Sequence, residues 1–284
     1  MDSRNRPVVA VVDGRFVSEG AGVRIRRTIG SPELDMLDPF LLLDEFKSDS
    51  ADDYLAGFPD HPHRGFETVT YMLAGNMQHR DHMGNQGDLG PGSVQWMTAG
   101  RGIIHSEMPR QERGLMWGFQ LWVNLPSDDK MCEPRYQDIP PDAVPDVALD
   151  GGGKVRVLAG QFGDVQGAVS GIATSPTYLH VELPAGGAFE HALPSTHNAV
   201  AYIFDGGGAI GEGGEGDKLS AGKLAVLGDG DTLHARAGEQ GMQFLLLAGR
   251  PLAEPVARYG PFVMNTRDEI MQAVRDYQQG KLLG

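Results

Sequence analysis

The two halves of this chain resemble one another, and this duplication constrains the fold more than any other feature of the sequence. Three segments of the first half have counterparts in the second half in the same order. The paired segments are 69–75 with 200–206, 91–94 with 221–224, and 120–123 with 243–246. The offset in residue number is not the same for the three pairs, and loops of unequal length in the two halves explain the difference. Such a repeat predicts a duplicated β-domain, in which each copy forms a small closed or sandwiched barrel.

Short strands separated by tight turns are the expected local structure. The 40 Gly and 18 Pro among 284 residues favour turns and argue against a helical bundle or a coiled coil. Alternating or β-branched patterns predict strands at 8–12, 69–73, 94–98, 116–125, 154–158, 177–183, 199–204 and 242–247. One helix is expected at 266–279, where Thr266 and Glu269 have the spacing of a capping box before an apolar stripe.

A polar, proline-rich segment at 125–147 divides the chain nearly in half and has the composition of an extended connection. The domain boundaries expected from it are an N-terminal domain at 1–130, a linker at 131–150, and a C-terminal domain at 151–284 that includes the terminal helix.

Charge and composition exclude several classes of function. The chain has 38 acidic and 24 basic side chains and a net charge of −14, which disfavours direct binding to nucleic acid or to an anionic membrane surface. The N-terminal residues lack the apolar stretch of a signal peptide, and no apolar run approaches the roughly 20 residues that cross a bilayer. Cys132 is the single cysteine, so no intramolecular disulfide forms. We expect a cytoplasmic protein that does not enter the membrane.

Two pairs of side chains in the first half are suited to a transition metal. His61 and His63 are separated by one residue, as are His105 and Glu107. Residues two apart on a strand point to the same face, so each pair can direct two donors into one barrel. Three imidazoles and a carboxylate would hold an ion such as iron, manganese, nickel, copper or zinc and leave positions for external ligands.

The second half serves as an internal control for this site. The positions that align with His61 and His63 are Ala192 and Pro194. The positions that align with His105 and Glu107 are His234 and Arg236, and an arginine repels a cation. We therefore expect one metal per chain and a second domain that binds none.

Three blocks of the first half resemble the pirin family within the cupin superfamily: 38–46 (DPFLLLDEF), 61–69 (HPHRGFETV) and 95–109 (QWMTAGRGIIHSEMP). The second half resembles pirin C-terminal domains more loosely. This resemblance implies an all-β fold of two tandem cupin domains, each a β-barrel or jelly roll, with a C-terminal helix. It also implies one iron-type centre, with Fe(II) the expected ion, at positions matching His61, His63, His105 and Glu107.

Glu67 follows His63 at the spacing of a ligand in the general cupin pattern. In pirins the carboxylate ligand corresponds to Glu107 instead, so we expect Glu67 to orient a ligand or Arg64 through a hydrogen bond. The nearby His79 and His82 lack the context of a metal motif, and we expect them in a solvated loop.

The pirin resemblance implies two functions of different classes. The first is a metal-dependent dioxygenase that cleaves a flavonol such as quercetin with dioxygen, with Glu107 as the base for the flavonol 3-hydroxyl. The second is an iron-dependent, redox-sensing regulator that binds a protein partner, in the manner of a transcription cofactor. We favour the enzyme, because the sequence shows an open four-donor site and marks no partner surface.

Overall fold

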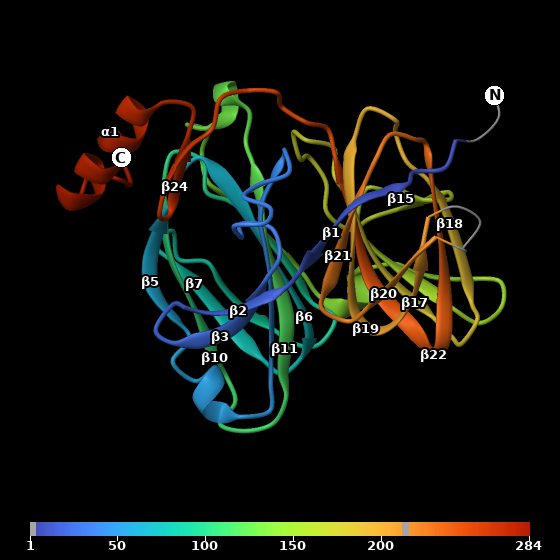
Figure 1. The fold of residues 1–284 in the computed structure, drawn as a ribbon. Coiled ribbons are helices and arrows are strands. Elements are labelled where there is room, and N and C mark those ends of the chain that lie inside the picture. Colours follow the sequence, from blue (N-terminus) through green and yellow to red (C-terminus); the bar gives the residue numbers. More distant parts are fainter. Residues whose placement is uncertain (1–3, 212–215) are drawn as a thin grey trace. The chain divides into compact units, whose positions relative to one another are not determined.

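The computed structural model describes residues 4–211 and 216–284, which form many β-strands and one α-helix (Figure 1). The all-β class and the C-terminal helix are therefore confirmed. The described residues form two compact units that are discontinuous in sequence. Unit 1 takes the N-terminal segment up to residue 15, residues 32–38 and the stretch between 142 and 251, and unit 2 takes 16–31, 39–141 and 252–284. No helix in these described parts has the length and apolar character needed to cross a membrane.

Unit 2 contains a seven-stranded antiparallel sheet. In spatial order its strands are β12 (Arg135–Ile139), β9 (Val94–Thr98), β6 (Phe66–Ala74), β11 (Met116–Asn124), β4 (Phe40–Ser48), β3 (Val23–Arg27) and β2 (Arg15–Glu19). The first seven residues of β4 are all buried, which explains why its sequence reads as a nearly continuous apolar run instead of an alternation.

A second sheet of unit 2 carries the predicted metal-binding residues. Its strands are β5 (Phe58–His63), β10 (Ile103–Pro109), β7 (Met77–Asp81) and β8 (Gln86–Leu89), in that spatial order. Two short 3-10 turns also belong to unit 2: η1 (Ala51–Asp53) connects β4 to β5, and η2 (Ser127–Asp129) connects β11 to β12. Apolar side chains from both sheets share one core cluster: Val23, Ile25, Phe46, Tyr54, Met72, Met77, Leu89 and Met116. The two sheets therefore enclose a common interior, as in a barrel.

Unit 1 is built around a nine-stranded antiparallel sheet with its own apolar core. Its main path runs β1 (Val8–Asp13), β21 (Lys223–Leu227), β19 (Asn198–Ile210), β22 (Thr232–Gly249), β17 (Thr177–Leu183), β14 (Lys154–Ala159) and β13 (Asp146–Ala148). Off this path lie β18 (Ala188–Ala192) on β22 and β20 (Asp217–Ser220) on β19. The remaining elements are η3 (Pro141–Ala143) and the hairpin of β15 (Gln161–Phe162) and β16 (Val165–Gln166).

The strand order of the two units reproduces the sequence repeat. In unit 2, β6 lies between β9 and β11, and in unit 1, β19 lies between β21 and β22. These are the three pairs of segments that the sequence alignment matches. The edge place that β12 takes beside β9 is taken in unit 1 by β1 beside β21. The duplication is thus a property of the fold and not only of the sequence.

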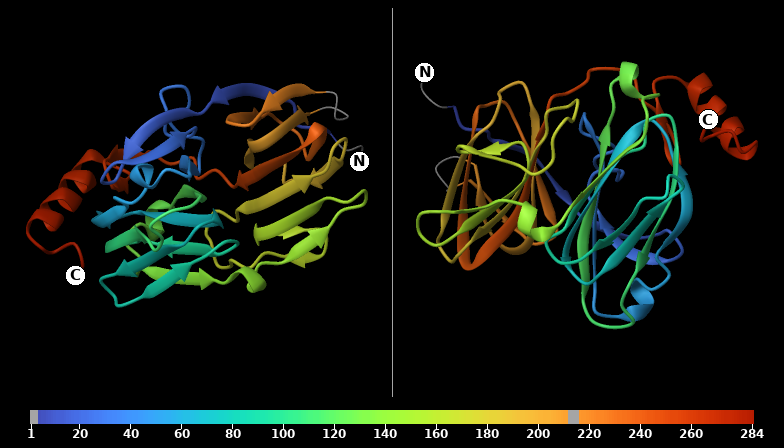
Figure 2. Two further views of the ribbon diagram at one scale, coloured as in Figure 1. Left: turned by 90° about the horizontal axis from the view of Figure 1, so that it is seen from below. Right: turned by 180° about the vertical axis from the view of Figure 1, so that it is seen from behind.

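Both ends of the chain belong to a unit other than the one their sequence position indicates. Strand β1 pairs with β21 of unit 1, whereas β23 (Ala257–Tyr259), β24 (Phe262–Met264) and α1 (Arg267–Gln278) belong to unit 2 (Figures 1 and 2). The contiguous ranges 1–130 and 151–284 therefore do not describe these units. The region expected as a linker, 131–150, also differs, because it supplies β12 and β13 to the two sheets.

Helix α1 begins as its sequence predicts. The Thr266 hydroxyl accepts a hydrogen bond from the Glu269 backbone N–H, and the Glu269 carboxylate accepts one from the Thr266 backbone N–H. The helix is tied to unit 2 by an ion pair between Asp276 and Arg64, 2.7 Å long. Gly65 lets β24 approach, because a Cβ at this position would lie 2.0 Å from the Val263 carbonyl oxygen. The residues next to His63 thus hold the C-terminal segment.

Candidate metal centre and cavity

The pairing of β5 with β10 brings three of the predicted ligands together. His105 is directly opposite His61 in the antiparallel register, and His63 lies two residues further along β5. The potential ligand atoms of the three histidines lie within 4.8 Å of one another. In the described part of the chain, these side chains form the group that could hold a metal ion. Strand β5 is an edge strand, which explains why it tolerates Pro59 and Pro62.

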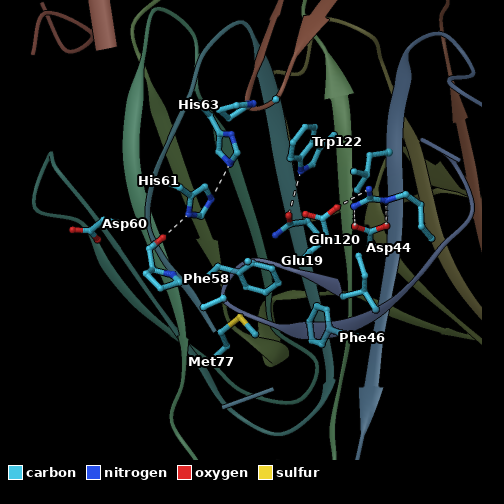
Figure 3. Close-up of a pocket in the computed structure, with 18 of the residues that line it drawn as sticks. Glu19, Asp44, Phe46, Phe58, Asp60, His61, His63, Met77, Gln120 and Trp122 are labelled. Atoms are coloured by element: carbon cyan, nitrogen blue, oxygen red, sulfur yellow. Dashed lines mark hydrogen bonds and ion pairs between the residues drawn. The ribbon is translucent and has the colours of Figure 1, made fainter. Parts of the chain in front are cut away.

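Hydrogen bonding fixes how His61 presents its ring. Its Nδ1 lies 2.8 Å from the Pro59 carbonyl oxygen, which only accepts, so Nδ1 carries the proton and Nε2 keeps its lone pair. That Nε2 lies 3.1 Å from Nε2 of His63 (Figure 3). A divalent cation between nitrogens so placed would be bound by both.

Burial keeps the other two imidazoles neutral. His63 and His105 are 2% and 1% exposed, and burial lowers the pKa of each well below its usual value. The neighbouring histidines lower both pKa values further. Nε2 of His105 is buried without a hydrogen-bond partner. Neutral nitrogens with an unshared pair are the form that binds metal, so the three residues fit a transition ion.

Glu107 is buried close to this group but is not part of it. Its two carboxylate oxygens accept hydrogen bonds of 2.7 Å from the Thr70 hydroxyl and the Gln120 side-chain amide. A β-bulge lies between His105 and Glu107 in the pairing with β5, so that Glu107 is opposite Phe58. The extra residue is on β5, whereas β10 keeps a regular register with β7, so His105 and Glu107 stay on the same face of β10.

Glu67 lies apart from the three histidines as well. Its carboxylate accepts a 2.6 Å hydrogen bond from the Thr98 hydroxyl. Thr70, which contacts Glu107, is three residues along β6, so alternation places Glu67 on the opposite face of the strand. The expected bond to Arg64 is not found, because the Arg64 guanidinium donates to Asp276 and to backbone carbonyls of unit 2.

A cavity of about 510 Å³ opens beside the histidines, within the size range of small-molecule sites. Figure 3 shows His61, His63 and Trp122 at one end and Phe46 and Met77 at the other. The walls are thus largely apolar and aromatic next to a set of metal-binding nitrogens. This arrangement suits a flat aromatic ligand that has one polar group directed at the metal.

An ionic cluster forms part of the same cavity wall, and the sequence analysis did not single it out. Arg27 donates to both oxygens of Asp44, at 2.8 and 2.7 Å, and pairs with Glu19 at 2.8 Å. Burial raises the pKa of Asp44 to about 6, although Arg27 opposes this shift. The only sequence signal was that Asp44 interrupts an apolar strand.

His79 is the clearest departure from the sequence-based expectation. It was expected in a solvated loop, yet it lies in β7 and is fully buried, whereas His82 is exposed. The sequence does contain a signal for its position: His79 and Asp81 are two residues apart, the spacing of side chains on one face of a strand. The structure places His79 next to His105.

Comparison with known proteins decides the family. The pirin family model matches residues 22–123, and the model of the pirin C-terminal cupin domain matches residues 178–283. The chain belongs to the pirin family. This pirin therefore has two cupin domains, and the resemblance noted in the sequence is confirmed.

Several relatives are similar to this pirin over nearly its whole length. A Pseudomonas aeruginosa protein provisionally named as a quercetin 2,3-dioxygenase is 51% identical over 284 residues, covering 99% of both chains. Human pirin is 44% identical over 280 residues, covering 98% of this chain and 94% of its own. The crystal structure of a quercetin 2,3-dioxygenase from Acinetobacter baumannii matches with a TM-score of 0.88 and 34% identity, covering 98% of each chain. An Escherichia coli pirin solved with nickel(II) shares the fold, with a TM-score of 0.68 and 19% identity over 85% of this chain and 99% of its own.

The three-histidine group predicts one metal ion per chain. Replacing His105 with Ala should weaken metal binding by more than the roughly 10–100-fold that is typical of changes around a ligand, because a ligand itself is lost. His234→Ala is the matched control, since His234 aligns with His105 in the other unit. The measurements are metal content by mass spectrometry and affinity by calorimetry. Two equivalents per chain, or full affinity in His105→Ala, would contradict the prediction.

Glu67 predicts a pH-dependent stability. Burial raises the pKa of Glu67 to about 7, whereas the unfolded value is near 4.5. The stability of the fold therefore falls as the pH rises from about 4.5 to about 7, because the carboxylate must then be charged in a buried position. Glu67→Gln removes this cost, and should be about 1–3 kcal/mol more stable relative to the parent at pH 8 than at pH 4. Denaturant unfolding of both proteins at the two pH values measures the difference. A difference that does not change with pH would show that Glu67 is not protonated in the fold.

Proposed function

We propose that this pirin is a metal-dependent dioxygenase that cleaves flavonols such as quercetin with loss of carbon monoxide. The observation that carries the proposal is the position of the His61, His63 and His105 group beside an aromatic cavity of about 510 Å³. The names of the similar proteins from Pseudomonas aeruginosa and Acinetobacter baumannii support the same substrate class.

The metal that we propose is Fe(II), held by His61, His63 and His105 with Glu107 as the fourth donor. Iron held there would act as a Lewis acid for the flavonol oxygens and would relay electrons from the flavonol to dioxygen. His63 and His105 are buried, and burial lowers the pKa of each, while the Pro59 carbonyl directs the free Nε2 of half-buried His61 towards them, so the group suits a borderline ion of this kind.

The chain's own residues orient the flavonol and take its proton. Trp122 and Phe46 bound the cavity and offer aromatic surfaces to the flat rings. Glu107 is our candidate base for the 3-hydroxyl, because it is a buried carboxylate whose Oε2 accepts from Gln120, a residue of the cavity wall. Trp122 in turn donates to the Gln120 oxygen over 3.2 Å, which fixes the direction of the amide.

Quercetin turnover tests the proposal directly. Iron-loaded protein should consume oxygen and release carbon monoxide with quercetin, whereas zinc-loaded protein should bind the flavonol without turnover, because zinc has no accessible redox states. A flavone that lacks only the 3-hydroxyl should be inert. Glu107→Gln should remain folded and lose about 100-fold or more in turnover, as expected for a lost base.

Glu67→Gln is the matched control, because it removes a buried carboxylate from the other face of β6 and should retain most of the turnover. The reverse ranking of the two variants would move the carboxylate ligand and base to Glu67. If the iron form consumes no oxygen with quercetin, and iron oxidation instead changes the affinity for a protein partner, the regulatory function replaces the enzymatic one.

A further inference from the structure

A second buried histidine and an aspartate lie behind the His105 ligand, on the side away from His61. His79 and Asp81 are both on β7, and their side chains have no exposed surface. Strand β7 pairs with β10, with Asp81 opposite His105 and His79 opposite Glu107. Neither side chain is among the residues of the cavity wall.

Hydrogen bonds hold Asp81 in place, and a chain of hydrogen bonds connects it through His79 to His105. Asp81 Oδ1 accepts from the backbone N–H groups of Met83 and Asn85, each over 3.0 Å. Its Oδ2 accepts from the Asn85 amide over 2.8 Å and lies 3.3 Å from His79 Nε2. Because the carboxylate accepts, His79 carries its proton on Nε2 and has a lone pair on Nδ1. That Nδ1 lies 3.3 Å from Nδ1 of His105, which must therefore be the donor.

The consequence falls on the other nitrogen of His105. With its proton on Nδ1, the lone pair of His105 is on Nε2, the buried atom without a hydrogen-bond partner. Metal-binding histidines generally donate their other ring N–H to an acceptor that fixes the tautomer and the ring orientation. His61 does so to the Pro59 carbonyl, and His105 does so to His79.

The ring of His79 is itself held in place. Tyr136 of β12 stacks on it, with ring centroids 4.8 Å apart and an interplanar angle of 25°. Gly87 leaves room for that tyrosine, because a Cβ at this position would lie 2.0 Å from the Tyr136 hydroxyl oxygen. The stack restrains the imidazole in the plane that it needs to face both Asp81 and His105.

We propose that Asp81 and His79 are positioning residues that fix the tautomer of His105 and so raise the affinity of the site for a divalent metal. This inference rests on the metal centre proposed above. It assigns a role to two residues that contact neither the proposed metal nor the substrate.

Asp81→Asn is the sharpest variant, because it preserves the shape of the side chain. The two backbone N–H groups keep an oxygen at the Oδ1 position, so the amide nitrogen takes the place of Oδ2 and donates to His79. His79 then carries its proton on Nδ1, and His105 on Nε2, where the metal would bind. We expect nickel(II) or cobalt(II) affinity to fall by about 10–100-fold while the unfolding temperature changes little.

Two substitutions of His79 separate hydrogen bonding from packing. His79→Phe keeps a ring against Tyr136 but removes the acceptor, and should also weaken metal binding by about 10–100-fold. His79→Asn loses the stack but offers an oxygen near the former Nδ1 position, and should stay within about fivefold of the parent. His180→Phe is the matched control, a buried histidine of unit 1 that is bonded to Gln243, and should leave metal affinity unchanged.

Calorimetric titration with nickel(II) measures these affinities, and proton NMR of the cobalt(II) form gives a readout that packing alone would not move. The parent should show a shifted, slowly exchanging Nδ1–H signal from His105 that is absent in His79→Phe. Parent-like affinity in both Asp81→Asn and His79→Phe would overturn the inference, as would equal losses in His79→Asn and His79→Phe. A parent protein that binds no metal would overturn the proposed centre itself, whereas a parent that binds metal and variants that bind it equally well would overturn only this inference.

Discussion

The antiparallel pairing of β5 with β10 is the constraint on which the rest of the site depends. It sets His105 opposite His61 and leaves His63 on the same face, so three side chains from two distant segments meet. A shift of one residue would turn one histidine pair away from the interior. The bulge next to this pairing is on β5 and leaves β10 regular, so Glu107 lies on the same face as His105 and accepts hydrogen bonds from Thr70 and Gln120.

The buried imidazoles of this group lower the stability of the fold, because not all of their ring nitrogens have hydrogen-bond partners. His105 has a ring nitrogen that is buried without a partner, and burying an unpaired polar atom costs about 1–3 kcal/mol. The surroundings nevertheless maintain this arrangement, through the Pro59 carbonyl for His61 and through His79 for His105. The fold keeps these nitrogens oriented although their burial is destabilising, and this is the physical reason to regard the three histidines as a functional centre.

Local sequence patterns predict much of the fold, and long-range pairing accounts for what they miss. Strands such as Val94–Thr98 and Thr177–Leu183 and the capping box of α1 follow from alternation and capping chemistry within a few residues. The pairing of β1 with β21 does not, because a short apolar strand carries little information about its partner. The burial of His79 was missed for the same reason, since it depends on the pairing of β7 with β10.

A crystal structure of the cobalt(II)-loaded protein, with anomalous scattering from the metal, would show which residues bind the ion. We expect one anomalous peak per chain, in unit 2, bound by Nε2 of His61, His63 and His105, with Glu107 the carboxylate nearest to the ion. A peak bound by other residues, an equally strong peak near His234 in unit 1, or no peak beside the three histidines would contradict this expectation.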